Sequence, residues 1–91
     1  MTIKVRIPTP LRRLTAGQDT LQLSGESLSQ CIENLEAQFP GLRGRLLDET
    51  GELRRFVNIY VNGEDVRFLQ GLGTPLKPGD EVSIVPAVAG G

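Results

Sequence analysis

Apolar and polar side chains alternate strictly at the start of the chain. Ile3, Val5 and Ile7 are apolar, and the residues between them are polar. This period of two predicts a half-buried β-strand that begins almost at the first residue. Similar short patterns predict four further strands, at 20–24, 56–61, 65–67 and 81–85.

Between the second and third of these strands, the apolar spacing changes to that of an amphipathic helix. Its apolar stripe consists of Leu28, Cys31, Ile32, Leu35 and Phe39. Ser27 and Gln30 have the spacing of a capping box, in which each side chain satisfies a free backbone donor of the other residue. The pair at 40–41, proline and glycine, ends the helix. Cys31 is expected to be a packed core thiol, because free cysteine is among the most buried residue types.

The segments between these elements are predicted to be loops and turns. Residues 9–19 should form a loop, and 42–47 should form about one helical turn. Asn62 and Gly63 are a strong hairpin signal, and 77–80 has proline and glycine where a turn needs them. The single apolar stripe of the helix needs a sheet as its partner. The order of elements therefore predicts an α+β fold, a ubiquitin-like β-grasp: one main helix packs on one face of a mixed sheet whose first and last strands lie side by side.

Composition restricts the classes of function. With 91 residues, of which 38% are hydrophobic and 23% charged, the chain fits one globular domain. Its net charge of −1, with acidic and basic residues interspersed, gives no sign of nucleic-acid binding. One cysteine and no histidine exclude a disulfide framework, the common zinc ligand sets and a Ser-His or Cys-His catalytic pair. The chain is therefore not expected to be an enzyme.

The sequence also lacks an apolar run long enough to span a membrane and a signal-peptide pattern at its amino end. No membrane partner is expected, and the cytoplasm is the expected location.

The last residues are interpreted as a flexible tail, 86–91, that leaves a β-grasp domain of residues 1–85. Pro86 cannot donate a hydrogen bond to a sheet, so it is expected to end regular pairing. The segment that follows has no charged side chain and ends in two glycines. The alternative interpretation is a frayed chain end, because termini are commonly disordered.

The Gly-Gly ending is typical of a terminus that enters another protein's active site. A residue without a side chain lets the backbone lie in a narrow slot, where any Cβ would clash. Val88, Ala89 and Gly90 are expected to thread into the active site of a partner. The carboxylate of Gly91 is the candidate reactive group.

The strand at 56–61 suggests where a partner docks. If Val57 and the alternate residues after it face the helix, then Phe56 and Tyr60 project from the open face of the sheet. Val85 and Pro86 lie where the last strand leads into the tail, and they complete the expected partner-binding surface. The alternative is that one of the two aromatic side chains packs under the loop that follows the first strand.

The end of the chain resembles the ThiS/MoaD family of ubiquitin-like sulfur carriers. The matching segments are Pro78-Gly79-Asp80-Glu81-Val82 and Ile84-Val85-Pro86-Ala87-Val88-Ala89-Gly90-Gly91. The family commonly ends in an apolar pair, Pro-Pro-Val, one variable residue and Gly-Gly. Ala87 stands here in place of the second proline. Within the family, the segments 55–62, 64–68 and 86–91 are most similar to the carriers that feed sulfide to cysteine synthesis.

This resemblance implies a carrier that binds no cofactor of its own. An E1-like enzyme would adenylate Gly91 with ATP and magnesium, and a sulfur donor would convert it to a thiocarboxylate. A pyridoxal-phosphate-dependent cysteine synthase would accept the sulfur, and a JAMM-type metalloprotease would release cysteine from the carrier. In the family the apolar residue before the proline contacts the activating enzyme, which here corresponds to Val85.

Other classes of function remain open from the sequence. The same ending is found in ubiquitin-like protein modifiers that join their last glycine to lysines. Carriers for molybdopterin or thiamine biosynthesis share it as well. A plain β-grasp binding module with an incidental tail is the remaining alternative.

Overall fold

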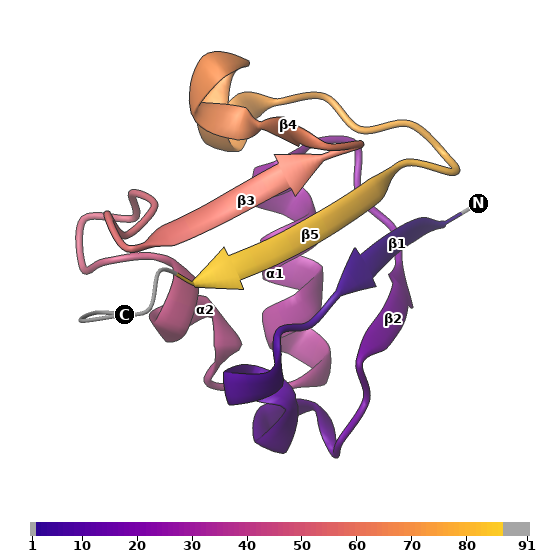
Figure 1. Ribbon diagram of the computed structural model, residues 1–91, viewed down its shortest axis with the longest axis vertical. Coiled ribbons are helices and arrows are strands. Elements are labelled where there is room, and N and C mark those ends of the chain that lie inside the picture. Colours follow the sequence, from indigo (N-terminus) through magenta and orange to yellow (C-terminus); the bar gives the residue numbers. More distant parts are fainter. Residues whose placement is uncertain (1, 87–91) are drawn as a thin grey trace.

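Five strands form one mixed sheet in the computed structural model, which describes residues 2–86 (Figure 1). The strand order is β2-β1-β5-β3-β4. β1 and β5 pair in parallel at the centre, and the other neighbours pair antiparallel, as the β-grasp prediction requires. The strands are β1 (Ile3–Arg6), β2 (Thr20–Leu23), β3 (Val57–Val61), β4 (Glu64–Asp65) and β5 (Glu81–Pro86).

One face of the sheet carries the core, and α1 (Leu28–Gln38) covers it (Figure 1). The buried sheet residues follow the predicted period of two: Ile3, Val5, Ile7, Leu21, Leu23, Val57, Ile59, Val61, Val82 and Ile84. The helix contributes Leu28, Cys31, Ile32 and Leu35. Fully burying an aliphatic side chain such as Leu35 contributes about 2 kcal/mol to folding. No helix within residues 2–86 is long and apolar enough to cross a membrane.

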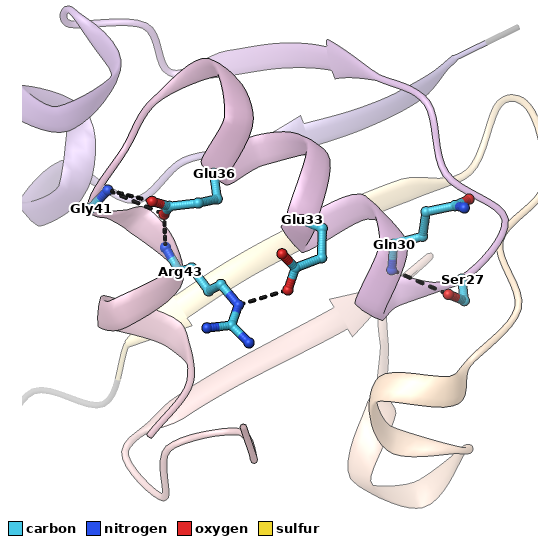
Figure 2. Close-up of polar contacts among 6 residues, drawn as sticks. All are labelled: Ser27, Gln30, Glu33, Glu36, Gly41 and Arg43. Carbon is cyan, nitrogen blue, oxygen red and sulfur yellow. Dashed lines mark hydrogen bonds and ion pairs between the residues drawn. The ribbon is translucent and has the colours of Figure 1, made fainter. Parts of the chain in front are cut away.

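The start of α1 follows the capping prediction in one of its two bonds. Ser27 Oγ accepts a hydrogen bond from the backbone N–H of Gln30 at 3.2 Å (Figure 2). The side chain of Gln30 reaches back as predicted, but its Oε1 accepts from the N–H of Glu26 at 2.7 Å, one residue before the expected donor. Both side chains therefore satisfy free backbone N–H groups at the helix start, but the one bonded by Gln30 belongs to Glu26 and not to Ser27.

Glu36 joins α1 to the short helix α2 (Leu42–Leu46), the predicted helical turn. Its carboxylate accepts from the backbone N–H of Gly41 at 3.1 Å and of Arg43 at 2.9 Å (Figure 2). These bonds, the one from Arg43 first, lower the pKa of Glu36. Arg43 Nε also reaches Glu33 at 2.6 Å. Together these contacts fix the direction in which α2 leaves α1, which places α2 at one end of the sheet.

The segment expected to be a loop at 9–19 is mostly a 3₁₀ helix, Thr9–Thr15. A proline in its first turn suits a helix start, where the missing N–H costs nothing. Leu11 and Thr15 are buried, and the hydroxyl of Thr15 donates to the carbonyl of Gln18 at 2.8 Å. The prediction of a loop was wrong. The apolar residues of this segment do not recur at helical spacing, but burial of Leu11 in the core stabilises the helical turns.

The expected strand at 65–67 is also shorter than predicted. β4 ends at Asp65, whose Oδ1 accepts from the N–H of Arg67 at 2.8 Å and caps a 3₁₀ helix, Val66–Phe68. A second 3₁₀ helix follows at Gly71–Gly73. The hairpin between β3 and β4 turns at Asn62 and Gly63, which have φ values of 52° and 86°, as the Asn-Gly pair predicts.

Candidate functional site

β5 extends through Pro86, one residue beyond the predicted domain boundary. Pro86 lies opposite Val57 in the sheet. The N–H of Val57 donates to the carbonyl of Arg54 at 3.1 Å and is therefore already satisfied. A proline is tolerated at the last position of a strand, where little pairing remains to be lost. The sheet thus holds the backbone up to the residue from which the predicted tail starts.

The predicted threading residues Val88, Ala89 and Gly90, and the predicted reactive residue Gly91, lie outside the described residues. Their roles stay predictions. The described part of the candidate site is the end of the sheet that precedes them.

Val85 and Tyr60 lie on the face of the sheet that α1 does not cover. Val85 pairs with Asn58, and its side chain is 45% exposed between the buried Ile84 and the end of the strand. Tyr60 lies between the buried residues of β3 and is half-buried. Both residues lie on the open face, as expected, and their part in binding a partner stays a prediction.

Phe56 lies apart from Tyr60. β3 begins at Val57, so the alternation of the strand does not extend to Phe56, which sits in the turn before it. Its side chain is 55% exposed and lines hollows together with Gly44 and Arg45 of α2. Phe56 therefore belongs to the end of the sheet beside α2, and not to the open face with Tyr60.

The alternative, that one of the two aromatic side chains packs under the segment after the first strand, holds only in part. Phe56 shares a hollow with Pro10 and Leu11 of the first 3₁₀ helix, but more than half of its side chain stays exposed. The segment that carries it is fixed from the other side by Arg67, whose Nη2 donates to the carbonyl of Arg54 at 2.8 Å. The aromatic ring is thus presented from a held backbone.

Arginines surround this end of the sheet, a feature that the sequence analysis missed. Arg45 lines the hollow beside Pro86, while Arg6 and Arg12 line a second hollow that Pro86 shares. Arg55 lines a third one with Phe56. These arginines come from four separate stretches of sequence, so no local motif predicts that they lie together.

Cys31 is the only cysteine of the chain, and the residue is 2% exposed. Burial raises the pKa of the thiol to about 11, so it is almost entirely protonated near neutral pH. A protonated, enclosed thiol is a poor nucleophile, and the core role predicted for Cys31 is confirmed. Within residues 2–86 no three of the metal-ligating side chains form a group that could hold an ion.

Comparison with known proteins gives a consistent result over the whole chain. The ThiS family model matches residues 5–91. The sulfur carrier protein CysO of Mycobacterium tuberculosis is 53% identical over 93 aligned residues that cover 100% of both chains. A crystal structure of that protein has a TM-score of 0.90 at 51% identity, covering 94% of this chain and 99% of the other.

Two further solved structures share the fold. A chain in the BexX/CysO complex of Amycolatopsis orientalis has a TM-score of 0.93 at 44% identity, covering 98% of this chain and 99% of that one. The small archaeal modifier protein 1 of Methanosarcina acetivorans has a TM-score of 0.83 at 38% identity, covering 99% of this chain and 96% of that one. With this fold, a family match that includes the Gly-Gly ending and identity above one half to a relative of equal length, the chain belongs to the ThiS family.

Proposed function

We propose that this chain is a sulfur carrier protein that delivers sulfide for cysteine biosynthesis. The observation that carries the proposal is the 53% identity to CysO over the full length of both chains. The family match runs to Gly91, so the Gly-Gly ending belongs to the shared part. The carrier is a substrate of other enzymes and has no catalytic role of its own, and the cytoplasm is where it acts.

The chemistry begins at the carboxylate of Gly91, which is a poor electrophile until it is activated. On an E1-like partner that holds ATP and magnesium, a carboxylate oxygen attacks the α-phosphorus and pyrophosphate leaves. The product is a mixed anhydride with AMP. A sulfur nucleophile at the oxidation level of sulfide then attacks the acyl carbon, and AMP leaves with the bonding electrons. Gly91 now ends in a thiocarboxylate.

The later steps belong to two other partners. A pyridoxal-phosphate-dependent cysteine synthase would supply an activated, dehydrated serine, and the thiocarboxylate sulfur would add to its β-carbon to give a thioester between Gly91 and the new cysteine. The acyl group would then pass from that sulfur to the amino group of the same cysteine. A JAMM-type metalloprotease would hydrolyse the resulting amide, which releases cysteine and restores the carboxylate of Gly91.

Two features of the folded body support a carrier in which the ending does the chemistry. The thiol of Cys31 is enclosed and protonated, so it is unsuited to carrying sulfur on the body. The sheet fixes the backbone as far as Pro86. The residues from 87 to 91 can span at most about 17 Å when extended, enough for a terminus to enter a partner's active site while the body stays outside.

The test is reconstitution with the E1-like enzyme, ATP, magnesium and sulfide, read by intact mass. The wild-type chain should gain the mass of one sulfur in place of one oxygen. Deleting Gly91, or adding one alanine after it, should abolish both pyrophosphate release and the mass change, while circular dichroism stays unchanged. An alanine added before Met1 is the matched control and should leave the reaction intact. A tail-deleted chain that is still fully adenylated would refute the proposal.

Protein modification is the second candidate, because small archaeal modifier protein 1 shares the fold at 38% identity. It uses the same activated Gly91 but transfers the acyl group to a lysine of another protein. Denaturing gels of cell extracts with the tagged chain separate the two. A ladder of covalent adducts that resists thiols and requires Gly91 favours a modifier, whereas thiocarboxylate mass without a ladder favours a carrier.

Carriers for molybdopterin or thiamine biosynthesis would give the same thiocarboxylate mass. They differ in the acceptor that consumes it. Cysteine formation from the thiocarboxylate by a pyridoxal-phosphate enzyme, and its failure with the Gly91 deletion, assigns the pathway.

A further inference from the structure

An apolar hollow of about 300 Å³ lies where β5 ends, beside α2 and the first 3₁₀ helix. Figure 1 shows β5 finishing next to α2, at the start of β3. We name this feature the end hollow. Its apolar lining is formed by Pro10, Leu11, Phe56, Val57, Ile84 and Pro86. Phe56 leaves more than half of its surface uncovered, so the end hollow is open to another molecule.

The rim of the end hollow is basic. Arg45 of α2 lines it directly. The adjoining hollows, which share Phe56 or Pro86 with it, are lined by Arg6, Arg12, Arg54 and Arg55. The overall charge of the chain is only −1, so this clustering of one sign is local. A basic rim around an apolar centre attracts a group with the opposite charge and an apolar tip.

Asp48 is the carboxylate that lines this group of hollows, and it interacts electrostatically with one arginine of the rim, Arg54. Its Oδ1 accepts from the hydroxyl of Thr50 at 2.6 Å and from the N–H groups of Thr50 and Glu52 at 2.9 and 3.1 Å. The hydroxyl of Thr50 is the main reason that the pKa of Asp48 is lowered. The carboxylate is therefore engaged by its own turn.

Three of the five rim arginines already have a partner in the chain. Arg6 lies 3.9 Å from a carboxylate oxygen of Glu81. Arg12 and Arg54 each donate Nε to a backbone carbonyl, of Ile7 and Gly44 respectively, both at 3.0 Å. In contrast, Arg45 and Arg55 form neither an ion pair nor a side-chain hydrogen bond with any residue in 2–86. Both residues are exposed. Each lines a hollow together with Phe56, Arg45 from α2 and Arg55 from the turn before β3.

We propose that the end hollow docks an acidic segment of the adenylating partner, with one apolar side chain seated against Phe56 and carboxylates on Arg45 and Arg55. The proposal rests on the proposed function and adds a second contact surface for the same partner, separate from the surface of Val85 and Tyr60. A partner that binds both surfaces at the end of β5 would direct residues 87–91 into its active site. Charge steering of this kind raises the association rate more than it slows dissociation.

Charge also disfavours the competing occupants. A second copy of the chain would bring the same arginine rim against itself in a two-fold contact. A nucleic acid would meet an otherwise weakly acidic protein, whose net charge opposes its approach. The chain's own residues 87–91 have no charged side chain and bring one carboxylate, that of Gly91, to a rim with two available arginines.

The test compares two double charge reversals that change the net charge equally. R45E/R55E removes the available arginines, whereas R13E/K77E changes exposed basic residues outside the end hollow and is the matched control. Adenylation of each variant is followed by pyrophosphate release, and binding to the purified E1-like enzyme is measured by calorimetry without ATP. R45E/R55E should raise the KM for the carrier by about tenfold or more, as expected for lost steering, with kcat little changed. The control should stay within about twofold of the wild type.

The dependence of binding on ionic strength is a second measurement. It would not change if Arg45 and Arg55 only stabilised the fold. Added salt should weaken wild-type binding steeply and weaken R45E/R55E binding much less, because screening acts on the charges that the variant has lost. Phe56→Ala should raise KM without changing the salt dependence. Equal KM values for both double variants, with normal adenylation, would overturn the docking proposal and leave the sulfur-carrier function standing.

Other outcomes are equally decisive. If the wild type binds the enzyme but is never adenylated, the proposed function fails while the docking surface stands. A dimer in sedimentation experiments that R45E/R55E dissolves would show that the occupant is a second copy. Amide shifts at Arg45 and Phe56 on truncation after Pro86 would show that the chain's own tail fills the end hollow. Either result overturns the proposal.

Discussion

The two ends of β5 use their polar groups in opposite ways. At the start of the strand, Asp80 is 8% exposed, and its carboxylate accepts from Asn62 Nδ2 at 3.0 Å and from the N–H of Lys77 at 2.8 Å. Asn62 Oδ1 in turn accepts from the N–H of Glu81 at 3.0 Å. At the other end, Arg45 and Arg55 find no such partner among residues 2–86, and Phe56 and Val85 leave apolar surface uncovered.

The difference separates folding from recognition within one strand. The Asp80 end ties the hairpin turn of β3 and β4 to β5, and the N–H of Lys4 in β1 donates to the carbonyl of Asp80 at 3.0 Å. It therefore fixes the register of the central strands. The Pro86 end has little bonding left to make within the sheet, and its charged and apolar groups stay exposed, where the proposed partner would contact them. A carrier needs both a stable folded domain and, where its tail begins, a surface that a partner can bind.

The largest effect that we expect on stability comes from the Asp80 end. Asp80→Ala leaves the amide of Asn62 and the N–H of Lys77 without their acceptor in a mostly buried site. The cost should be about 1–3 kcal/mol in the free energy of unfolding, measured by urea denaturation. At a temperature where the variant stays folded, its affinity for the E1-like enzyme should match that of the wild type.

Asp19→Ala is the matched control, because Asp19 is exposed and its side chain makes no hydrogen bond within residues 2–86. It should change the stability little. If Asp80→Ala weakens partner binding as strongly as it lowers stability, the two ends are coupled and the separation drawn here is wrong.

A smaller effect, on binding alone, is expected at the Pro86 end. Val85→Asp places a charge on the open face, and Tyr60→Ser removes an aromatic side chain from it. Each should weaken binding to the E1-like enzyme by about tenfold or more, or about 1.4 kcal/mol. Calorimetry measures the affinity, and thermal melting should stay near the wild type.

Gln22→Asp is a control for the added charge, since Gln22 is exposed on β2, away from Val85 in the strand order. It should bind normally. Unchanged binding of both Val85→Asp and Tyr60→Ser would mean that the partner reads another face, and only the assignment of Gly91 would survive.

Much of this architecture could be predicted from the sequence, because its signals are local. The alternation around Ile3 and Ile59, the stripe that includes Leu35 and the Asn62-Gly63 turn each depend on neighbours in the chain. The family resemblance likewise rested on continuous segments, and the full-length match agrees with it.

The features that were missed depend on contacts between distant residues. Thr9–Thr15 becomes helical because Leu11 reaches the core. Pro86 stays in the sheet opposite Val57, whose N–H already donates to the carbonyl of Arg54. The alternation of apolar residues predicts that Phe56 lies on the same face of the sheet as Tyr60, but β3 begins one residue later, at Val57. The arginine rim is assembled only when the ends of β1, β3 and β5 meet α2, so no spacing in the sequence reveals it.

The smallest expected effect concerns acid and sharpens the role of Asp80. The bond from Asn62, followed by that from Lys77, lowers the pKa of Asp80 in the folded chain. A carboxyl group whose folded pKa is below its unfolded value, about 3.9, stabilises the fold above that pH, and this contribution is lost as the pH falls through the folded pKa. Asp80→Asn cannot titrate at this position. The gap in unfolding free energy between wild type and Asp80→Asn should therefore be widest near neutral pH and narrow below about pH 4. Glu36 and Asp48, whose pKa values are also lowered, are present in both proteins and cancel in the comparison. Urea denaturation at a series of pH values measures the gap, and a gap that stays constant down to the acid limit would show that Asp80 holds this end by shape and not by charge.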